Sequence, residues 1–168
     1  VLHEKGLTAS EPRIYAYGVL VLWTNKGTEL SRGLAGLADP QIARIALANP
    51  EQAPYGRAAV QAMQSAGIYD AVVTKLVYGE SIAQATHFLE TGAADIGFTA
   101  MSVVDAPAMR GTGRWVEVPA ESYEPIAQAA VMLQHGKEHN ADAAQRFFEY
   151  LFSEAAGEVL ARFGYKLP

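Results

Sequence analysis

The sequence contains no cysteine, and only 18% of its 168 residues are charged. Without thiols the chain can form neither disulfides nor thiolate metal sites, which leaves its redox compartment open. The small charged fraction argues against long disordered tails. Lysines and arginines form no cluster and the net charge is −5, so we do not expect nucleic acid as a partner.

Long hydrophobic runs are missing as well. No stretch reaches the roughly 18 apolar residues that a membrane-spanning helix needs. The chain shows no signal peptide and starts at Val1 without a methionine, so we expect the natural N-terminus to lie further upstream. Half of the residues are hydrophobic, which is enough for one well-packed domain or two small lobes.

The motifs of common enzyme classes are also absent. The sequence has neither a Gly-Lys-Ser/Thr phosphate loop nor a Gly-x-Ser-x-Gly elbow, and its carboxylates suggest no acid–base pair. His135 and His139 have the spacing of metal ligands, but Gly136 between them favours a solvated turn over a shared helix face. We therefore predict a binding protein rather than an enzyme, with no cofactor and no direct cation site.

What the chain does contain is an alternation of strand-like and helix-like segments. Strands are predicted over 15–23, 42–48, 75–78, 94–99, 115–119 and, after a proline, 125–133. Helices are predicted from Pro54 to Gly67, from Ser81 to Gly92, and twice near the end, from Asn140 and from Ser153. This order predicts an α/β fold with βαβ units and a mostly parallel sheet. Ligands of such sheets bind beyond the carboxyl ends of the strands.

The sharpest local feature is the passage from strand to helix over residues 48–58. Pro54 suits the first helical position. The first turn should then direct the N–H groups of Tyr55, Gly56 and Arg57 outward, with the positive end of the helix dipole behind them. Gly56 would let the backbone come close to a ligand. Arg57 is either a ligand cation or a solvent-facing helix residue.

A second junction, over residues 78–84, follows the same logic. Ser81 is placed to cap a helix whose first N–H groups belong to Ile82 and Ala83. Two such N-termini converging on one point would bind a tetrahedral dianion through neutral donors. Most helix N-termini, however, bind only water or their own cap, so spacing alone leaves both interpretations open. The candidate anion ligands are Tyr55 and Ile82, and beside them Pro54, Gly56 and Ser81.

Six stretches, taken in order, resemble the periplasmic molybdate-binding proteins of ABC importers. They are residues 15–23, 48–56, 79–85, 92–98, 123–126 and 163–168, and together they extend over nearly the whole chain. The ordered set is far more specific than any one stretch. The resemblance implies a periplasmic-binding-protein-like fold, in which two α/β lobes are joined by two crossover strands and the ligand lies in the cleft.

The resemblance also implies how the chain divides. Residues 1–16 would be a remnant of lobe 1 with the first crossover, 17–122 would be lobe 2 with both oxyanion loops, and 123–168 the return crossover and C-terminal helices of lobe 1. Lobe 2 would be nearly complete and lobe 1 only partly present, because the family's N-terminal segment, which supplies two Ser/Thr-type ligand loops, has no counterpart here. The implied hinge residues are Tyr15, Ala16, Tyr17, Tyr123, Glu124 and Pro125.

The function that the resemblance implies is capture of molybdate or tungstate in the periplasm and delivery to a membrane-embedded ABC permease. Tyr55 and Ile82 lie at positions where the family donates a backbone N–H to the oxyanion. The alternative is an anion-sensing effector domain of a transcription regulator with a similar fold. A helix-turn-helix upstream would indicate the regulator, and a signal peptide there would exclude it.

An incomplete lobe 1 would have one further consequence. The apolar faces of the last two helices would lack their sheet partner, at Phe147, Phe148, Leu151, Leu160 and Phe163. Exposed patches of this kind promote association. We therefore expect this stretch of chain to form a dimer or to exchange segments between copies.

Overall fold

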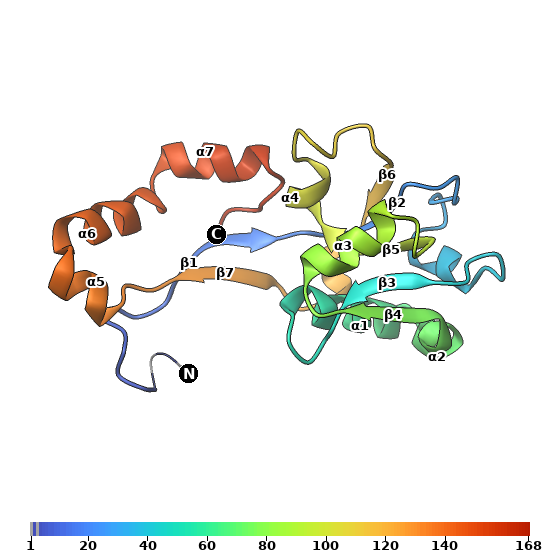
Figure 1. The fold of residues 1–168 in the computed structure, drawn as a ribbon, viewed down its shortest axis with the longest axis horizontal. Coiled ribbons are helices and arrows are strands. Elements are labelled where there is room, and N and C mark those ends of the chain that lie inside the picture. The colour runs from blue at the N-terminus through green and yellow to red at the C-terminus, as the bar shows by residue number, and fades with distance from the viewer. Residues whose placement is uncertain (1, 3) are drawn as a thin grey trace. The chain divides into compact units, whose positions relative to one another are not determined.

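The computed structural model describes residue 2 and residues 4–168, so positions 1 and 3 of the predicted segment 1–16 lie outside the described residues. The chain forms two compact units, and Figure 1 labels their helices and strands along the ribbon. One contains the residues up to Tyr17 together with Ala127–Pro168, and the other is Gly18–Ile126. Among the described residues, no helix has the length and apolarity needed to cross a membrane. The assignment of residues 1–16, 17–122 and 123–168 to two lobes of a whole protein stays a prediction.

The unit Gly18–Ile126 is built on a five-stranded sheet with the order β4-β3-β5-β2-β6. Its strands are β2 (Leu20–Thr24), β3 (Ile45–Ala48), β4 (Leu76–Gly79), β5 (Ile96–Ala100) and β6 (Arg114–Glu117). β3 pairs in parallel with both β4 and β5. β2 runs antiparallel to β5 and to β6. The sheet is therefore mixed, and the predicted parallel order holds for β4, β3 and β5.

Side chains that alternate along the buried strands divide between the two faces of this sheet. Leu20 and Leu22 belong to one buried cluster, with residues of α1 (Pro54–Ser65) and α2 (Tyr69–Val72). Val21 and Trp23 belong to a second cluster, with residues of α3 (Ile82–Glu90) and α4 (Met101–Val104). The unit thus has three layers, and Figure 1 shows α1 and α3 on opposite sides of the sheet.

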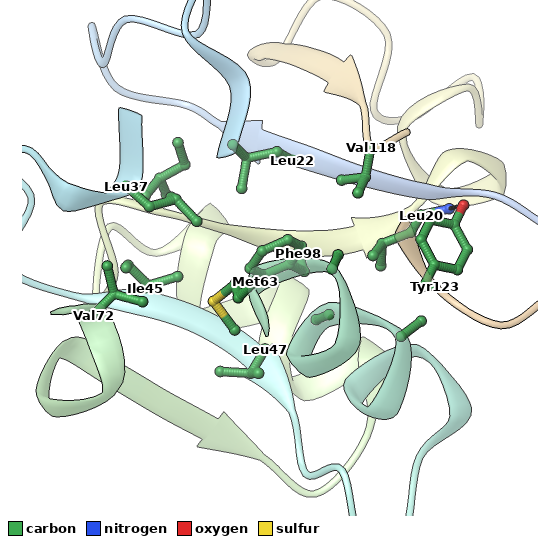
Figure 2. Close-up of a cluster of buried hydrophobic side chains, with 14 of the residues drawn as sticks. Leu20, Leu22, Leu37, Ile45, Leu47, Met63, Val72, Phe98, Val118 and Tyr123 are labelled. Carbon is green, nitrogen blue, oxygen red and sulfur yellow. Dashed lines mark hydrogen bonds between the residues drawn. The ribbon is translucent and has the colours of Figure 1, made fainter. Parts of the chain in front are cut away.

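The larger of the two clusters holds the main core, shown in Figure 2. Phe98 of β5 and Met63 of α1 are both fully buried, and η1 (Gly33–Ala38) adds the buried Leu37. Burial of each such side chain stabilises the fold by roughly 1.5–3 kcal/mol. Tyr123 packs in the same cluster, and its hydroxyl accepts a hydrogen bond of 3.2 Å from the Leu20 N–H. The chain segment after β6 is therefore attached to the first residue of β2.

Helix ends follow the local sequence rules. Pro54 is the first residue of α1, and the hydroxyls of Ser81 and Ser153 cap α3 and α7 (Glu154–Arg162). Two glycines with positive φ follow α1 and α7, Gly67 at 68° and Gly164 at 74°. Because a left-handed residue ends a helix and glycine adopts it without strain, these positions fix the stops. The predicted helices after Pro54, Ser81, Asn140 and Ser153 are confirmed.

Several predicted strands differ from the structure. The segment 125–133 forms a strand, β7, only over Ile126–Ala130, and the segment 94–99 begins its strand only at Ile96. The run 15–23 is not one strand but β1 (Arg13–Gly18) and β2, separated at Val19, because the chain changes its pairing partner there from β7 to β5. The segment 42–48 begins its strand only at Ile45, because the N–H groups of Ala43 and Arg44 donate to the carboxylate of Asp95 instead of to a strand. Short elements that the sequence did not predict are η1, α2, η2 (Val73–Lys75), α4, η3 (Ala120–Ser122) and α5 (Gln134–His139).

The other unit contains most of β1 and of β7 (Ile126–Ala130), which pair in a two-stranded sheet. Its helices are α5 (Gln134–His139), α6 (Ala141–Tyr150) and α7. Tyr17 and Lys166 exchange backbone hydrogen bonds of 2.7 and 2.9 Å, which tie the chain end to β1.

The predicted solvated turn at His135 and His139 is wrong, because both lie on α5 with their rings stacked 4.3 Å apart. In the part of the chain that the structure describes, no group of three potential ligands could hold a metal ion.

Candidate functional site

The two loops singled out from the sequence begin side by side. β3 and β4 are parallel neighbours in which Ala48 lies opposite Gly79, the last residue of each strand. The Asn49 N–H donates to the Gly79 carbonyl oxygen over 2.7 Å, so the pairing continues into the first loop. α1 and α3 therefore both start at the carboxyl edge of the sheet, where α/β folds bind ligands.

The first loop is held by its own backbone and places Pro54 at the start of α1. The N–H groups of Gln52 and Ala53 both donate to the Asn49 carbonyl. Two of the three N–H groups predicted to point outward are engaged, because Gly56 and Arg57 both donate to the Ala53 carbonyl, over 3.0 and 3.1 Å. This corrects the prediction for those two groups. Tyr55 is the second residue of the helix, a position for which the helix itself provides no carbonyl acceptor.

Gly56 has a different role from the one predicted. It is buried, and a Cβ at this position would overlap the Ala48 carbonyl group at the end of β3. The glycine is therefore required because α1 approaches the strand end backbone to backbone. Pro54 has no N–H and cannot donate to an anion, so its contribution is to begin the helix.

The second loop ends in a reciprocal cap. The Ser81 hydroxyl accepts from the Gln84 N–H over 3.2 Å, and the Gln84 side-chain oxygen accepts from the Glu80 N–H over 2.6 Å. The Ser81 carbonyl accepts from the Ala85 N–H. Within residues 2 and 4–168, the N–H groups of Ile82 and Ala83 make no hydrogen bond. The first turn of α3 thus presents two donors at this edge, while the Ser81 oxygen is occupied by capping.

Gly79 fixes the position of this second helix in the same way as Gly56 fixes the first. A Cβ on Gly79 would lie 2.7 Å from the Ala85 nitrogen, so α3 also approaches its strand end backbone to backbone. Arg57, in contrast, is exposed, and its guanidinium donates to the Pro50 carbonyl over 3.3 Å. Of the two interpretations of Arg57, the structure supports the surface-facing one.

The Tyr55 side chain lies beside Gly18, the first residue of this unit. It packs against the main core, and its hydroxyl occupies the space that a side chain on Gly18 would need. Tyr123 is buried in that core, and the Glu124 N–H donates to the Gln61 side chain of α1 over 3.1 Å. Sequence reasoning did not detect the contact of Tyr55 with Gly18, because the two residues are far apart in the chain.

The amino ends of β3 and β5, at the opposite end of these strands, carry an ion pair. Asp95 forms an ion pair of 2.7 Å with Lys26 and accepts from the N–H groups of Arg44 and Ala43 over 2.9 Å each. The hydrogen bond from Lys26, reinforced by those two N–H groups, holds the pKa of Asp95 below its usual value. A cavity of about 410 Å³ opens beside this ion pair. Because it lies at the amino end of β3 and β5, it is separate from both candidate loops.

Comparison with known proteins places this geometry in a family. The family of bacterial extracellular solute-binding proteins matches residues 1–166. The molybdate-binding protein ModA of Azotobacter vinelandii is 43% identical over 166 residues, which are 98% of this chain and 64% of that protein. ModA of Rhodobacter capsulatus is 39% identical over 151 residues, 90% of this chain and 58% of that protein. The chain thus spans less than two thirds of the length of these relatives.

Solved structures agree with the sequence matches. The periplasmic molybdate-binding protein of Azotobacter vinelandii superposes with a TM-score of 0.89 at 32% identity, covering 99% of this chain and 73% of that one. The sulfate-binding protein SubI of Mycobacterium tuberculosis, at 17% identity, shares the fold with a TM-score of 0.79, covering 99% of this chain and 64% of that one. The predicted α/β fold of periplasmic binding proteins is confirmed. Because the family matches nearly the full sequence, the chain belongs to the bacterial extracellular solute-binding proteins, a family of binding proteins and not of enzymes.

Proposed function

We propose that the chain is part of a periplasmic protein that captures molybdate or tungstate and delivers it to the permease of an ABC importer. The main support is that α1 and α3 both begin just after the carboxyl ends of the neighbouring parallel strands β3 and β4. Helix N-termini attract anions through their N–H groups and their dipoles. Tyr55 and Ile82 are the proposed backbone donors.

The chemistry suits a desolvated dianion. Neutral N–H donors select an oxyanion by the positions of its oxygens and by its size, without a salt bridge. Each hydrogen bond to a charged group is worth about 1.5–3 kcal/mol, so several together support tight capture. The net charge of −5 gives no long-range attraction for an anion, so local dipoles must do this work. The named relatives bind molybdate, and tungstate has the same charge and nearly the same size.

The proposed capture requires closure of two lobes about hinges at Tyr15–Tyr17 and Tyr123–Pro125. The segments 1–16 and 123–168 would belong to one lobe and 17–122 to the other. The closed form would then dock on the permease. No observation favours the alternative of a transcription regulator, since the matching family is named for extracellular proteins.

Self-association of the 168-residue chain is a further part of the proposal. Of the five residues predicted to be exposed, Phe147 of α6 is 64% exposed and Phe163, just after α7, is 38% exposed. The other three, Phe148, Leu151 and Leu160, are half-buried, whereas Tyr150, which was not predicted, is 49% exposed. Such apolar surface on two helices of one unit favours contact with a second copy. Sedimentation of the 168-residue chain tests this, and a monodisperse monomer at all concentrations would contradict it.

Isothermal titration of the complete gene product with molybdate, tungstate, sulfate and phosphate tests the binding function. We expect heat with molybdate and tungstate at one site per chain. Absence of heat with every one of these oxyanions would overturn the proposal.

One substitution can remove a single donor from the site. Ile82→Pro deletes the Ile82 N–H at the first helical position, where proline is well tolerated, and Ser81 before it is already extended. We expect the affinity for molybdate to fall about ten- to hundredfold, the value of one charge-assisted hydrogen bond. Glu154→Pro is the matched control, because it makes the same change at the first residue of α7 after the extended Ser153. Equal affinities in the two variants would exclude Ile82 as a ligand.

A further inference from the structure

Two buried hydroxyls lie between α3 and the sheet. Thr86 of α3 is 5% exposed and Thr99 of β5 is fully buried, and their Oγ1 atoms are 2.7 Å apart. In the described part of the chain, Thr24 is the only other polar side chain buried to this degree. A buried hydroxyl destabilises a fold unless it is hydrogen-bonded, so the arrangement of this pair requires a physical explanation.

The direction of the hydrogen bonds can be deduced. The Thr86 hydroxyl lies 2.8 Å from the Ile82 carbonyl oxygen, which can only accept, so the single hydroxyl proton of Thr86 is directed to Ile82. Thr99 must then be the donor to Thr86. The result is a chain of hydrogen bonds from Thr99, near the carboxyl end of β5, through Thr86, to the first residue of α3.

This chain ends on the backbone that the proposed function uses. The Ile82 carbonyl and the Ala83 N–H belong to one peptide group, so a donor on the carbonyl oxygen strengthens that N–H as a donor in turn. Apart from the Ser81 cap, the first turn of α3 is held by ordinary backbone bonds such as that from the Ala85 N–H to the Ser81 carbonyl, and its own first N–H groups have no partner within the helix. Attachment to β5, a central strand of the sheet, keeps this turn from fraying.

We infer that Thr86 and Thr99 are positioning residues that hold and polarise the anion-binding first turn of α3. The inference rests on the proposed function at Ile82 and adds the neighbouring Ala83 N–H as a second donor of the same turn to the oxyanion. Stability alone does not call for these hydroxyls, because valine has nearly the same shape, and replacing both partners of a buried hydrogen bond by apolar groups is often neutral. Because valines at both positions should leave the fold equally stable, the two hydroxyls are better explained by a role in fixing the geometry of the first turn of α3.

The test compares three variants of the complete gene product with the wild type in molybdate titration. We expect Thr86→Val with Thr99→Val to keep the melting temperature and to weaken binding about three- to tenfold, the effect of one lost hydrogen bond. Thr86→Ser keeps the hydroxyl and should restore wild-type affinity. Thr91→Val is the matched control, because Thr91 makes the same bond of 2.8 Å to the carbonyl four residues earlier, at the far end of α3.

A second readout separates this inference from the proposed function. The Ala85 N–H donates to the Ser81 carbonyl over 3.0 Å, so its hydrogen exchange reports opening of the first turn. We expect this exchange to be about three- to tenfold faster in the double valine variant and unchanged in Thr91→Val. If the wild type binds no oxyanion while the exchange responds as expected, the proposed function fails and the role of the threonines in holding the turn stands. Unchanged affinity and exchange in the double variant would overturn the inference.

Discussion

The Tyr55 hydroxyl lies where a Cβ on Gly18 would be, so these two residues share one space. Gly18 is the last residue of β1, and Tyr55 is the second residue of α1. The start of α1, at the end of the first candidate loop, therefore packs against the residue at which the chain enters this unit. Because a side chain on residue 18 and the ring of Tyr55 cannot coexist, the two positions must be strongly coupled.

Gly18→Ala should reveal this coupling. The added methyl would overlap the Tyr55 hydroxyl and lie 2.8 Å from its ring carbon Cζ, and such overpacking costs about 1–3 kcal/mol of unfolding free energy. Tyr55→Ala in the same chain removes the obstacle, so the double variant should be less destabilised than the sum of the two single variants. Urea denaturation of all four proteins measures this difference. Additive effects would mean that the two residues do not compete for space.

Gly56→Ala should destabilise the fold more than Gly18→Ala, because the added methyl group would collide with backbone atoms and not with a side chain. The Ala48 carbonyl cannot rotate away as a side chain can, so α1 must shift from the end of β3. We expect a loss of about 2 kcal/mol or more in unfolding free energy, typical of overpacked cores. Gly27→Ala is the control, since a Cβ there has no neighbour within 4 Å. Similar stability of the two variants would contradict the packing role of Gly56.

Much of the fold could be predicted from local sequence signals. Pro54 and Ser81 fixed the two helix starts that matter for the site, because capping and proline preferences depend on immediate neighbours. Pairing partners are non-local. The break at Val19 and the antiparallel course of β2 depend on which strands meet, and an unbroken apolar run contains no information about that.

The candidate site could be predicted only in outline. The sequence indicated two helix N-termini, and the adjacency of β3 and β4 brings them to one edge. The sequence could not show that Gly56 is needed for the close approach of α1 to Ala48, because that contact depends on how the helix packs against the end of β3. For the same reason the hydroxyl pair of Thr86 and Thr99 was not predicted, although a threonine four residues after a helix start was a visible hint.

Asp95 should make the stability of the fold depend on pH. Its pKa is lower in the folded protein than the ordinary value, so its contribution is present above about pH 4 and is lost as the pH falls through the folded pKa. Asp95→Asn should lower the free energy of unfolding by about 1–2 kcal/mol at pH 7. Most of this loss should come from weaker hydrogen bonds to the N–H groups of Ala43 and Arg44, because Lys26 is 41% exposed and solvent screens its ion pair with Asp95. Denaturation at pH 7 and pH 3 tests this. A difference between the variant and the wild type that does not shrink at pH 3 would contradict it.

Ser81 allows helix capping and anion binding to be separated. Asp and Asn cap helices as well as Ser, so Ser81→Asp and Ser81→Asn should both keep the bond that Ser81 now makes with the Gln84 N–H, and with it the stability of α3. Ser81→Asp adds a negative charge directly beside the proposed donor at Ile82, whereas Ser81→Asn adds none. Repulsion between like charges should therefore weaken molybdate binding by about tenfold or more in Ser81→Asp and leave it nearly unchanged in Ser81→Asn. The comparison is made by titration at low and at high salt, where screening should reduce the difference. If the two variants bind molybdate equally at low salt, the anion does not lie at the start of α3, and the proposed site is wrong even though the cap is intact.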